Sequence, residues 1–256
     1  MNRPDDVRQL SKLTFGLTLC MLLVAADAPK KGAPAAAGDD DVDYVPPASG
    51  APGGRKGGIA RGCKEDPSLY VSMLAPRSAG RTSQSQPVLF WYLSKPTRHE
   101  IDIALTPIDD LASPALRLKL ANGVDKAGIQ KLDLSRQHGP DGKKVMLKAG
   151  KTYDWVIEIV MHQSGGSNNP NATTFVQRAD LTKAQSDQLD KLPASRRAAF
   201  FANAGYWYDL LDELHQRISK DDDAAARQAW VRLLEKQGLK QSPDGTIEEA
   251  AAPSNP

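Results

Sequence analysis

The sequence predicts a mainly β protein: an immunoglobulin-like antiparallel β-sandwich followed by a C-terminal helical appendage, α+β overall. The first observation is a strict alternation of apolar and mixed residues over 152–161, which is typical of a strand with one face on a core. The second is a series of about seven short strand-like segments separated by Pro, Gly and Asn turns, with no helical run between them. The third is a change in the apolar period, from two to about 3.6 residues, after Asp180.

The N-terminal segment, residues 1–26, has the composition of a signal peptide. Three basic residues precede an apolar run from Leu13 to Ala26. This run is shorter than the ~20 residues that a membrane-spanning helix needs, and small residues before Asp27 offer a cleavage site near Ala26. Cleavage after Ala28 and retention as an uncleaved anchor are the alternatives. We expect an exported protein, periplasmic or extracellular, that contacts the membrane only through this segment.

Charge and cysteine content exclude some classes of protein. The chain has 33 Lys and Arg against 31 Asp and Glu, so no overall field favours nucleic acid or an anionic membrane surface. Cys20 lies in the signal segment, so Cys63 is the single cysteine of the mature chain and no internal disulfide can form. Cys63 is either a reactive thiol or incidental.

Two segments have the composition of disordered chain. Residues 27–62 are rich in Ala, Pro, Gly and Asp, and bury too little apolar surface to offset chain entropy, which predicts a low-complexity linker. Its later part, from Tyr44 on, favours a docked extended segment. Arg55 and Arg61 stand there among glycines and could bind a phosphate or polymer, although no phosphate-loop motif is present. Residues 241–256 predict a disordered polar tail.

We assign residues 63–180 to the sandwich. The segment 87–93 is apolar on both faces, which predicts a central strand. In the strand 152–161, Tyr153 and Trp155 share the core-facing side, and Tyr153 follows a Leu-x-x-Gly turn that resembles the tyrosine corner of immunoglobulin domains. The strands are expected at 69–74, 87–93, 99–105, 116–120, 128–134, 152–161 and 173–178.

Residues 181–240 have the signals of helices. A capping-box pattern at Thr182 begins the first, and Pro193 begins the second. An apolar stripe from Trp207 indicates a third, and the last ends at Gly238. A helical hairpin with one more helix is too small to be stable alone, so we expect it to lie against the sandwich.

Several motifs coincide with those of one family of exported bacterial proteins. The most specific runs from Arg197 to Leu211; the others are Tyr44-x-Pro-Pro47, the Gly-rich stretch 50–63, the Tyr153-x-Trp155 strand, Arg178 and Trp230. Over residues 44–240 the chain resembles the domain of unknown function 928 family. The resemblance implies export and this order of strands and helices. It brings no activity, cofactor or catalytic residue.

The residues themselves give no catalytic or metal-binding motif, so we expect no cofactor and no metal. The histidines, His99, His138, His162 and His215, have no ligand spacing, and no nucleophile motif occurs. Asp109 and Asp110 are neighbours in a predicted loop. Asp209, Asp212 and Glu213 are expected on a solvated helix face, with a backbone or Arg partner for Asp209 as the alternative.

The candidate residues are therefore expected either to contact a partner or to stabilise the fold. They are Tyr153, Trp155, Trp207, Tyr208, Asp209, Trp230, Arg55, Arg61 and Cys63. We expect the aromatic residues to form the seam between sandwich and helices, with sugar or peptide binding as the alternative.

Our hypothesis is a non-enzymatic interaction module of the cell envelope. Its partner would be an envelope protein or a cell-wall polymer, and its open sheet edges would suit strand addition. The alternatives are an envelope glycan- or peptide-processing enzyme and a structural subunit of an envelope assembly; the oligomeric state stays open.

Overall fold

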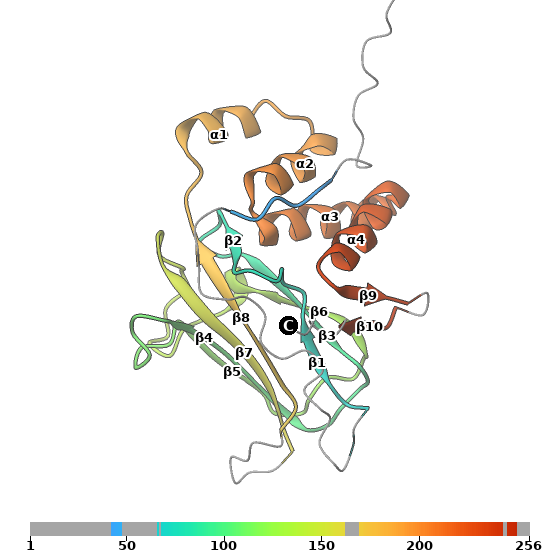
Figure 1. The fold of residues 1–256 in the computed structure, drawn as a ribbon. Helices are drawn as coiled ribbons and strands as arrows, with labels where there is room; N and C mark the ends of the chain where they lie inside the picture. The colour runs from blue at the N-terminus through green and yellow to red at the C-terminus, as the bar shows by residue number, and fades with distance from the viewer. Residues whose placement is uncertain (1–41, 48–65, 67, 162–168, 243–244, 250–256) are drawn as a thin grey trace, which may run out of the picture. The chain divides into compact units, whose positions relative to one another are not determined.

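The structure is a computed structural model that describes residues 42–47, 66, 68–161, 169–242 and 245–249. Its larger sheet has the strand order β2-β8-β7-β4-β5 (Figure 1). The bounds are β2 Gly80–Thr82, β4 Glu100–Pro107, β5 Leu116–Leu120, β7 Thr152–Val160 and β8 Asn171–Arg178. Strand β7 alternates as the sequence predicts, with Tyr153, Trp155, Ile157 and Ile159 buried.

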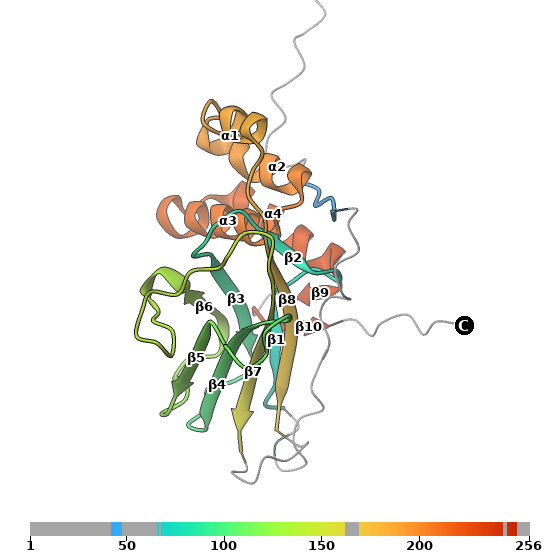
Figure 2. The ribbon, with the colours of Figure 1, turned by 90° about the vertical axis from the view of Figure 1, so that its left-hand side faces the viewer.

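The smaller sheet has the order β1-β3-β6, all antiparallel. Its strands are β1 Val71–Met73, β3 Val88–Leu93 and β6 Gly128–Asp133. Strand β3 is central and buried on both faces from Leu89 to Leu93, which confirms the prediction for 87–93. Figure 2 shows the two outer strands β5 and β6 on the same side of the molecule. Each of them pairs with a described strand along one side only.

The two sheets contribute to one hydrophobic core. Trp91 of β3 and Trp155 of β7 belong to the same buried cluster. At the start of β7 the Tyr153 hydroxyl accepts the Lys148 backbone N–H at 2.8 Å, which is the upstream contact expected of a tyrosine corner. The protein is therefore a sheet-rich α+β protein.

The prediction of a fully antiparallel sandwich is wrong at one edge, because β2 pairs with β8 in parallel. Strands β1 and β2 belong to different sheets. The short connection between them therefore carries the chain across to the second sheet instead of reversing it as a hairpin would.

In the described part of the chain four α-helices follow β8, and both views place α1 and α2 at one end of the sheets (Figures 1 and 2). The bounds are α1 Lys183–Leu189, α2 Ala194–Ala204, α3 Trp207–Asp221 and α4 Ala224–Lys236. Thr182 and Gln185 form the predicted capping box. Gly205, with φ 76°, ends α2 in the left-handed conformation that glycine adopts without strain. Helix α3 contacts β2 and β3, so the helices lie against the sheets as expected.

Residues 42–47 agree with the docked extended segment that the sequence predicts from Tyr44 on, and the docked part begins two residues earlier, within the predicted linker. Val42 and Tyr44 are buried, and the Tyr44 ring lies 4.9 Å from that of Trp207 between centroids. The prediction of a disordered tail needs correction. Within the predicted tail, β10 Ile247–Glu249 pairs with β9 Leu239–Gln241. Ile247 is buried there, and its carbonyl accepts the Tyr70 hydroxyl at 3.1 Å.

The predicted signal segment, residues 1–26, lies outside the described residues, as do Arg55, Arg61 and Cys63. In the part of the chain that the structure describes, no helix is both long enough and apolar enough to cross a bilayer.

Candidate functional site

The aromatic candidates lie in the interior, where sheets and helices meet. All are at most 4% exposed: Tyr153, Trp155, Trp207, Tyr208 and Trp230. The Trp207 indole N–H donates to the Leu74 carbonyl at 2.9 Å, and the Trp155 and Tyr208 rings lie 6.3 Å apart between centroids. Protein atoms cover Trp155, Trp207 and Tyr208 completely, so no sugar or peptide can stack on these three rings in this conformation; Tyr153 and Trp230 are also buried, and each lines a surface pocket. Their burial supports the interpretation that these aromatic residues pack between the sheets and the helices.

Asp209 is also buried, so the prediction of a solvated face is wrong for this residue, and the alternative of a backbone partner is confirmed. Its carboxylate accepts the Ser83 backbone N–H at 2.9 Å and also the Ser83 hydroxyl. Burial raises the pKa of Asp209, and the hydrogen bonds from Ser83 oppose that rise. The contact holds helix α3 against the segment that follows β2.

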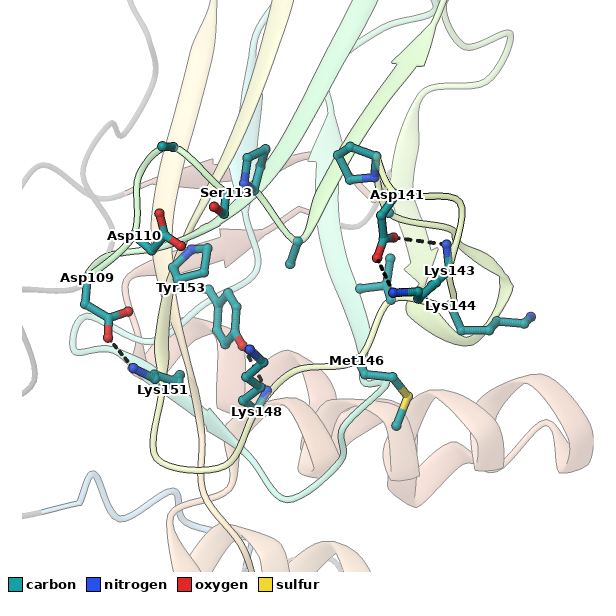
Figure 3. Close-up of a pocket in the computed structure, with 17 residues that line it drawn as sticks. Asp109, Asp110, Ser113, Asp141, Lys143, Lys144, Met146, Lys148, Lys151 and Tyr153 are labelled. Atoms are coloured by element: carbon teal, nitrogen blue, oxygen red, sulfur yellow. Dashed lines mark hydrogen bonds and ion pairs between the residues drawn. The ribbon is translucent and has the colours of Figure 1, made fainter.

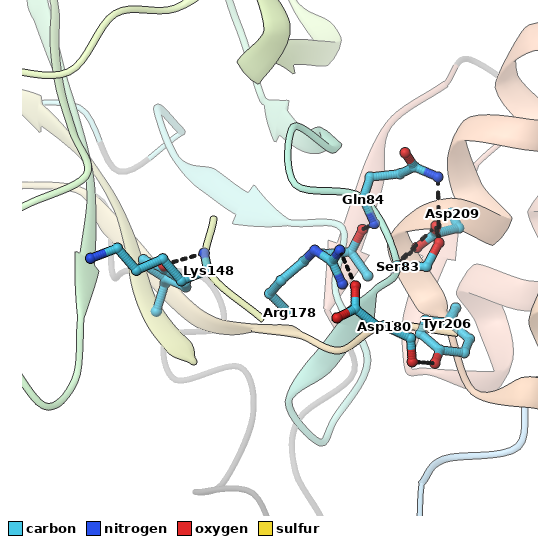
Figure 4. Close-up of polar contacts among 9 residues, drawn as sticks. Ser83, Gln84, Lys148, Arg178, Asp180, Tyr206 and Asp209 are labelled. Atoms are coloured by element: carbon cyan, nitrogen blue, oxygen red, sulfur yellow. Dashed lines mark hydrogen bonds and ion pairs between the residues drawn. The ribbon is translucent and has the colours of Figure 1, made fainter. Parts of the chain in front are cut away.

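A second polar cluster lies close to this contact (Figure 4). The Arg178 guanidinium, at the end of β8, pairs with Asp180 at 2.5 Å, and the Tyr206 hydroxyl donates to the Asp180 carbonyl at 2.9 Å. The Arg81 guanidinium lies 5.4 Å from the Tyr206 ring centroid, within cation–π range. These contacts connect the end of the larger sheet to the start of α3.

Glu213 and His215, among the remaining acids and histidines, contact other elements of the fold. Glu213 pairs with Arg197 at 3.2 Å. His215 packs on Phe90, with 4.9 Å between ring centroids. His162 lies outside the described residues. Among those that are described, no three His, Cys, Asp or Glu side chains are placed to hold a metal ion.

A surface pocket of about 640 Å³ lies where two loops meet at one end of the larger sheet (Figure 3). The β4–β5 connection supplies Pro107, Asp109, Asp110 and residues 112–115, and residues from the 139–148 segment form the facing side. Lys151 and Tyr153, at the start of β7, complete the lining. The Tyr153 hydroxyl fixes the second loop here, because it accepts the Lys148 backbone N–H and so joins that loop to β7.

Two of the three acidic residues that line this pocket, Asp109 and Asp141, are paired with a cation or a backbone donor. Lys151 forms an ion pair with Asp109 and holds the pKa of that carboxyl below its usual range. The Lys143 backbone N–H donates to Asp141 at 3.0 Å and lowers the pKa of Asp141. Both carboxyls are ionised at neutral pH, so neither can serve as a general acid there.

Exposed apolar side chains gather on the same two loops. Among the described residues the exposed large apolar side chains are Val45 at 51%, Ile108 at 39%, Leu111 at 69% and Met146 at 54%. All except Val45 belong to these two loops; Met146 lines the pocket, whereas Ile108 and Leu111 lie on the loop beside lining residues without lining the pocket themselves. We call Ile108, Leu111 and Met146, with the Asp109–Lys151 pair, the loop-end patch. Grouped exposed apolar side chains mark interaction surfaces, and Met adapts its shape to a partner.

Sequence reasoning missed the apolar part of this patch. It singled out Asp109 and Asp110 as loop neighbours and gave no role to Leu111 or Met146. The available signal was large apolar residues inside segments predicted to be turns, where no core-facing period accounts for them.

Comparisons with known proteins identify a family. A family model described as Domain of Unknown Function (DUF928) matches residues 53–247, in agreement with the resemblance given by the sequence motifs. No curated protein and no solved structure matches the chain significantly.

Proposed function

The chain belongs to the DUF928 family, and we propose that it is an exported, non-enzymatic interaction module of the cell envelope that binds a partner protein through the loop-end patch. The scaffold would be an immunoglobulin-like sandwich, supported by the shared core of the two sheets and by the Tyr153 contact. Export is supported by the composition of residues 1–26.

The observation that carries the proposal is the placement of exposed apolar side chains. Leu111 and Met146 are each more than half exposed, and they lie on loops that meet at one pocket. Protein interfaces have an apolar centre that excludes water and a polar rim. Here Leu111 and Met146 would form the centre, and the exposed Asp109–Lys151 pair would lie at the rim.

The chemistry of the patch supports binding over catalysis. A carboxyl that acts as general acid must hold a proton near neutral pH, whereas hydrogen bonds lower the pKa of both Asp109 and Asp141. The raised pKa of Asp209 belongs to a buried contact with Ser83, and neither residue lines the pocket.

An open sheet edge adjoins the patch and supports an extended contact. Strand β5 follows directly from the 107–115 loop, and its side away from β4 pairs with no described strand. A partner segment that adds to this edge would continue onto the patch. Such an extension would help the interface to reach the ~1,000 Å² expected of a stable complex.

The test compares partner capture by three forms of residues 27–256. The wild type and a Val45→Ser control should retain one envelope protein from a periplasmic extract. A Leu111→Ser/Met146→Ser double variant should retain at least ~10-fold less, since loss of interface anchors weakens binding by ~1–3 kcal/mol or more. Val45 is a suitable control because it is 51% exposed and lies outside the patch.

Equal retention by the double variant, or retention of no envelope protein by the wild type, would contradict the proposal. Turnover of a cell-wall glycan or peptide by the purified wild type would favour the enzyme alternative. Point variants are preferable to deletion of the helices, because α3 supplies the buried Trp207 to the common core.

A further inference from the structure

A second pocket, of about 600 Å³, lies on the helix side of the smaller sheet. Its walls come from α3, α4, the outer strand β6 and the end of β9, all labelled in Figure 1, together with Ser242 and Gly245 between β9 and β10. We call it the helix-side pocket. Its volume falls within the ~300–1,000 Å³ typical of small-molecule sites, and it shares no lining residue with the loop-end pocket.

The body of the helix-side pocket is apolar. Four of its lining side chains are hydrocarbon or aromatic: Ile129, Ile218, Trp230 and Val231. Trp230 and His215 both pack on the ring of Phe90, with centroid distances of 5.5 and 4.9 Å. Burial lowers the pKa of His215, so this ring is neutral at pH 7 and adds no charge to the pocket.

One permanent charge lines the pocket, the guanidinium of Arg227. Its side chain is 49% exposed, and its ion-pair partner Asp222 is 90% exposed. Exposed ion pairs contribute only ~0–1 kcal/mol, so an anion that also buries an apolar body can displace Asp222 at little cost. An Arg fork binds carboxylate or sulfonate oxygens with directed hydrogen bonds.

We propose that the helix-side pocket binds a free amphiphile that has an apolar body and one anionic head group, of the class of medium-chain carboxylates. The body lies against Ile218, Trp230 and Val231, and the head group meets Arg227. This site is independent of the loop-end patch and of the function proposed for it.

The test uses 8-anilinonaphthalene-1-sulfonate, an aromatic sulfonate that fluoresces in apolar surroundings, with residues 27–256 in the native state. One equivalent should bind. Arg227→Gln should weaken the Kd at least ~10-fold, as expected for loss of one charge-assisted hydrogen bond. Arg98→Gln should leave the Kd unchanged, because Arg98 is likewise an exposed arginine paired with an exposed aspartate, Asp125.

Three further comparisons separate this site from other sources of fluorescence. Val231→Trp, which fills the pocket without changing its charge, should abolish binding, while Leu111→Ser/Met146→Ser should retain it. Monomeric dodecanoate should displace the probe at least ~10-fold better than neutral dodecanol, given the charge at the head group. Circular dichroism would verify that each variant is folded.

The proposal is overturned if Arg227→Gln binds the probe as tightly as the wild type, if the loop-end variant loses binding, or if dodecanol competes as well as dodecanoate. It is also overturned if the wild type binds anionic vesicles but no monomeric amphiphile, since that result would indicate a membrane surface site.

Discussion

Two buried tryptophans provide a matched test of how the helices are joined to the sheets. Trp155 in β7 and Trp207 in α3 are both 0% exposed. The Trp207 indole N–H donates to the Leu74 carbonyl at 2.9 Å, whereas the Trp155 indole N–H has no partner among the described residues. Replacing either residue by Phe removes a similar volume, but only Trp207→Phe removes a hydrogen bond between helix and sheet.

The expected difference in the free energy of unfolding follows from that contrast. The loss of ring volume lowers stability by ~1–2 kcal/mol in both variants. Trp207→Phe also leaves the buried Leu74 carbonyl without its donor, which costs ~1–3 kcal/mol more. Trp155→Phe removes a buried N–H that has no partner, and the removal of this unpaired group offsets part of the stability that is lost with the ring volume.

The assay is urea unfolding followed by far-ultraviolet circular dichroism, with the m-values compared to exclude a change in the unfolded state. Trp207→Phe should be less stable than Trp155→Phe by at least ~1 kcal/mol. If Trp155→Phe costs as much as Trp207→Phe or more, the indole–carbonyl bond does not join α3 to the sheets as described.

Other variants test single contacts. Tyr153→Phe should lower stability by ~1 kcal/mol, because the Lys148 N–H loses its acceptor, and an unchanged urea midpoint would refute the corner contact. Gly80→Ala should lower stability by ~1–3 kcal/mol, since a Cβ there would lie 2.6 Å from the buried Tyr208 ring; wild-type stability would refute that close approach. Burial raises the pKa of Asp209 in the native state above its value in the unfolded chain. The native carboxyl therefore keeps its proton to higher pH, and the stability of the wild type should fall as the pH rises from ~4 through the native pKa. Asp209→Asn should remove this fall in urea midpoints measured between pH 4 and 7, and an unchanged pH profile would show that another group causes it.

Periodic and capping signals predicted the elements that depend on local sequence. The alternation over 152–161 identified β7 and its buried face, because one covered face imposes a period of two on any strand. Thr182 and Gln185 likewise marked the start of α1, because their side chains satisfy backbone groups that the first turn leaves free.

Tertiary contacts decided the elements that the sequence did not predict. Strand β2 has three residues including Gly80, and it forms because β8 pairs with it and α3 covers it. The docked segment was expected from Tyr44 on, but its partner was not: the Tyr44 ring packs on that of Trp207, far along the sequence. Local composition contains no information about such contacts.

The candidate site was less predictable than the fold for a related reason. The loop-end patch combines residues from 107–115 and 139–151, and neither loop has a period that assigns its side chains to a face. The exposure of Leu111 and Met146 becomes evident only when the two loops are placed together. The aromatic candidates were more conspicuous in the sequence, and they proved to be core residues.

Site-specific photo-cross-linking tests the proposed interaction surface most directly. A benzophenone amino acid would replace Met146 in cells, and a parallel chain would carry it at Arg98, whose side chain is 83% exposed and precedes the opposite end of β4. The proposed function predicts one cross-linked envelope protein from position 146, lost when Leu111→Ser is added, and none from position 98. No adduct at position 146, or the same adduct from both positions, would contradict it.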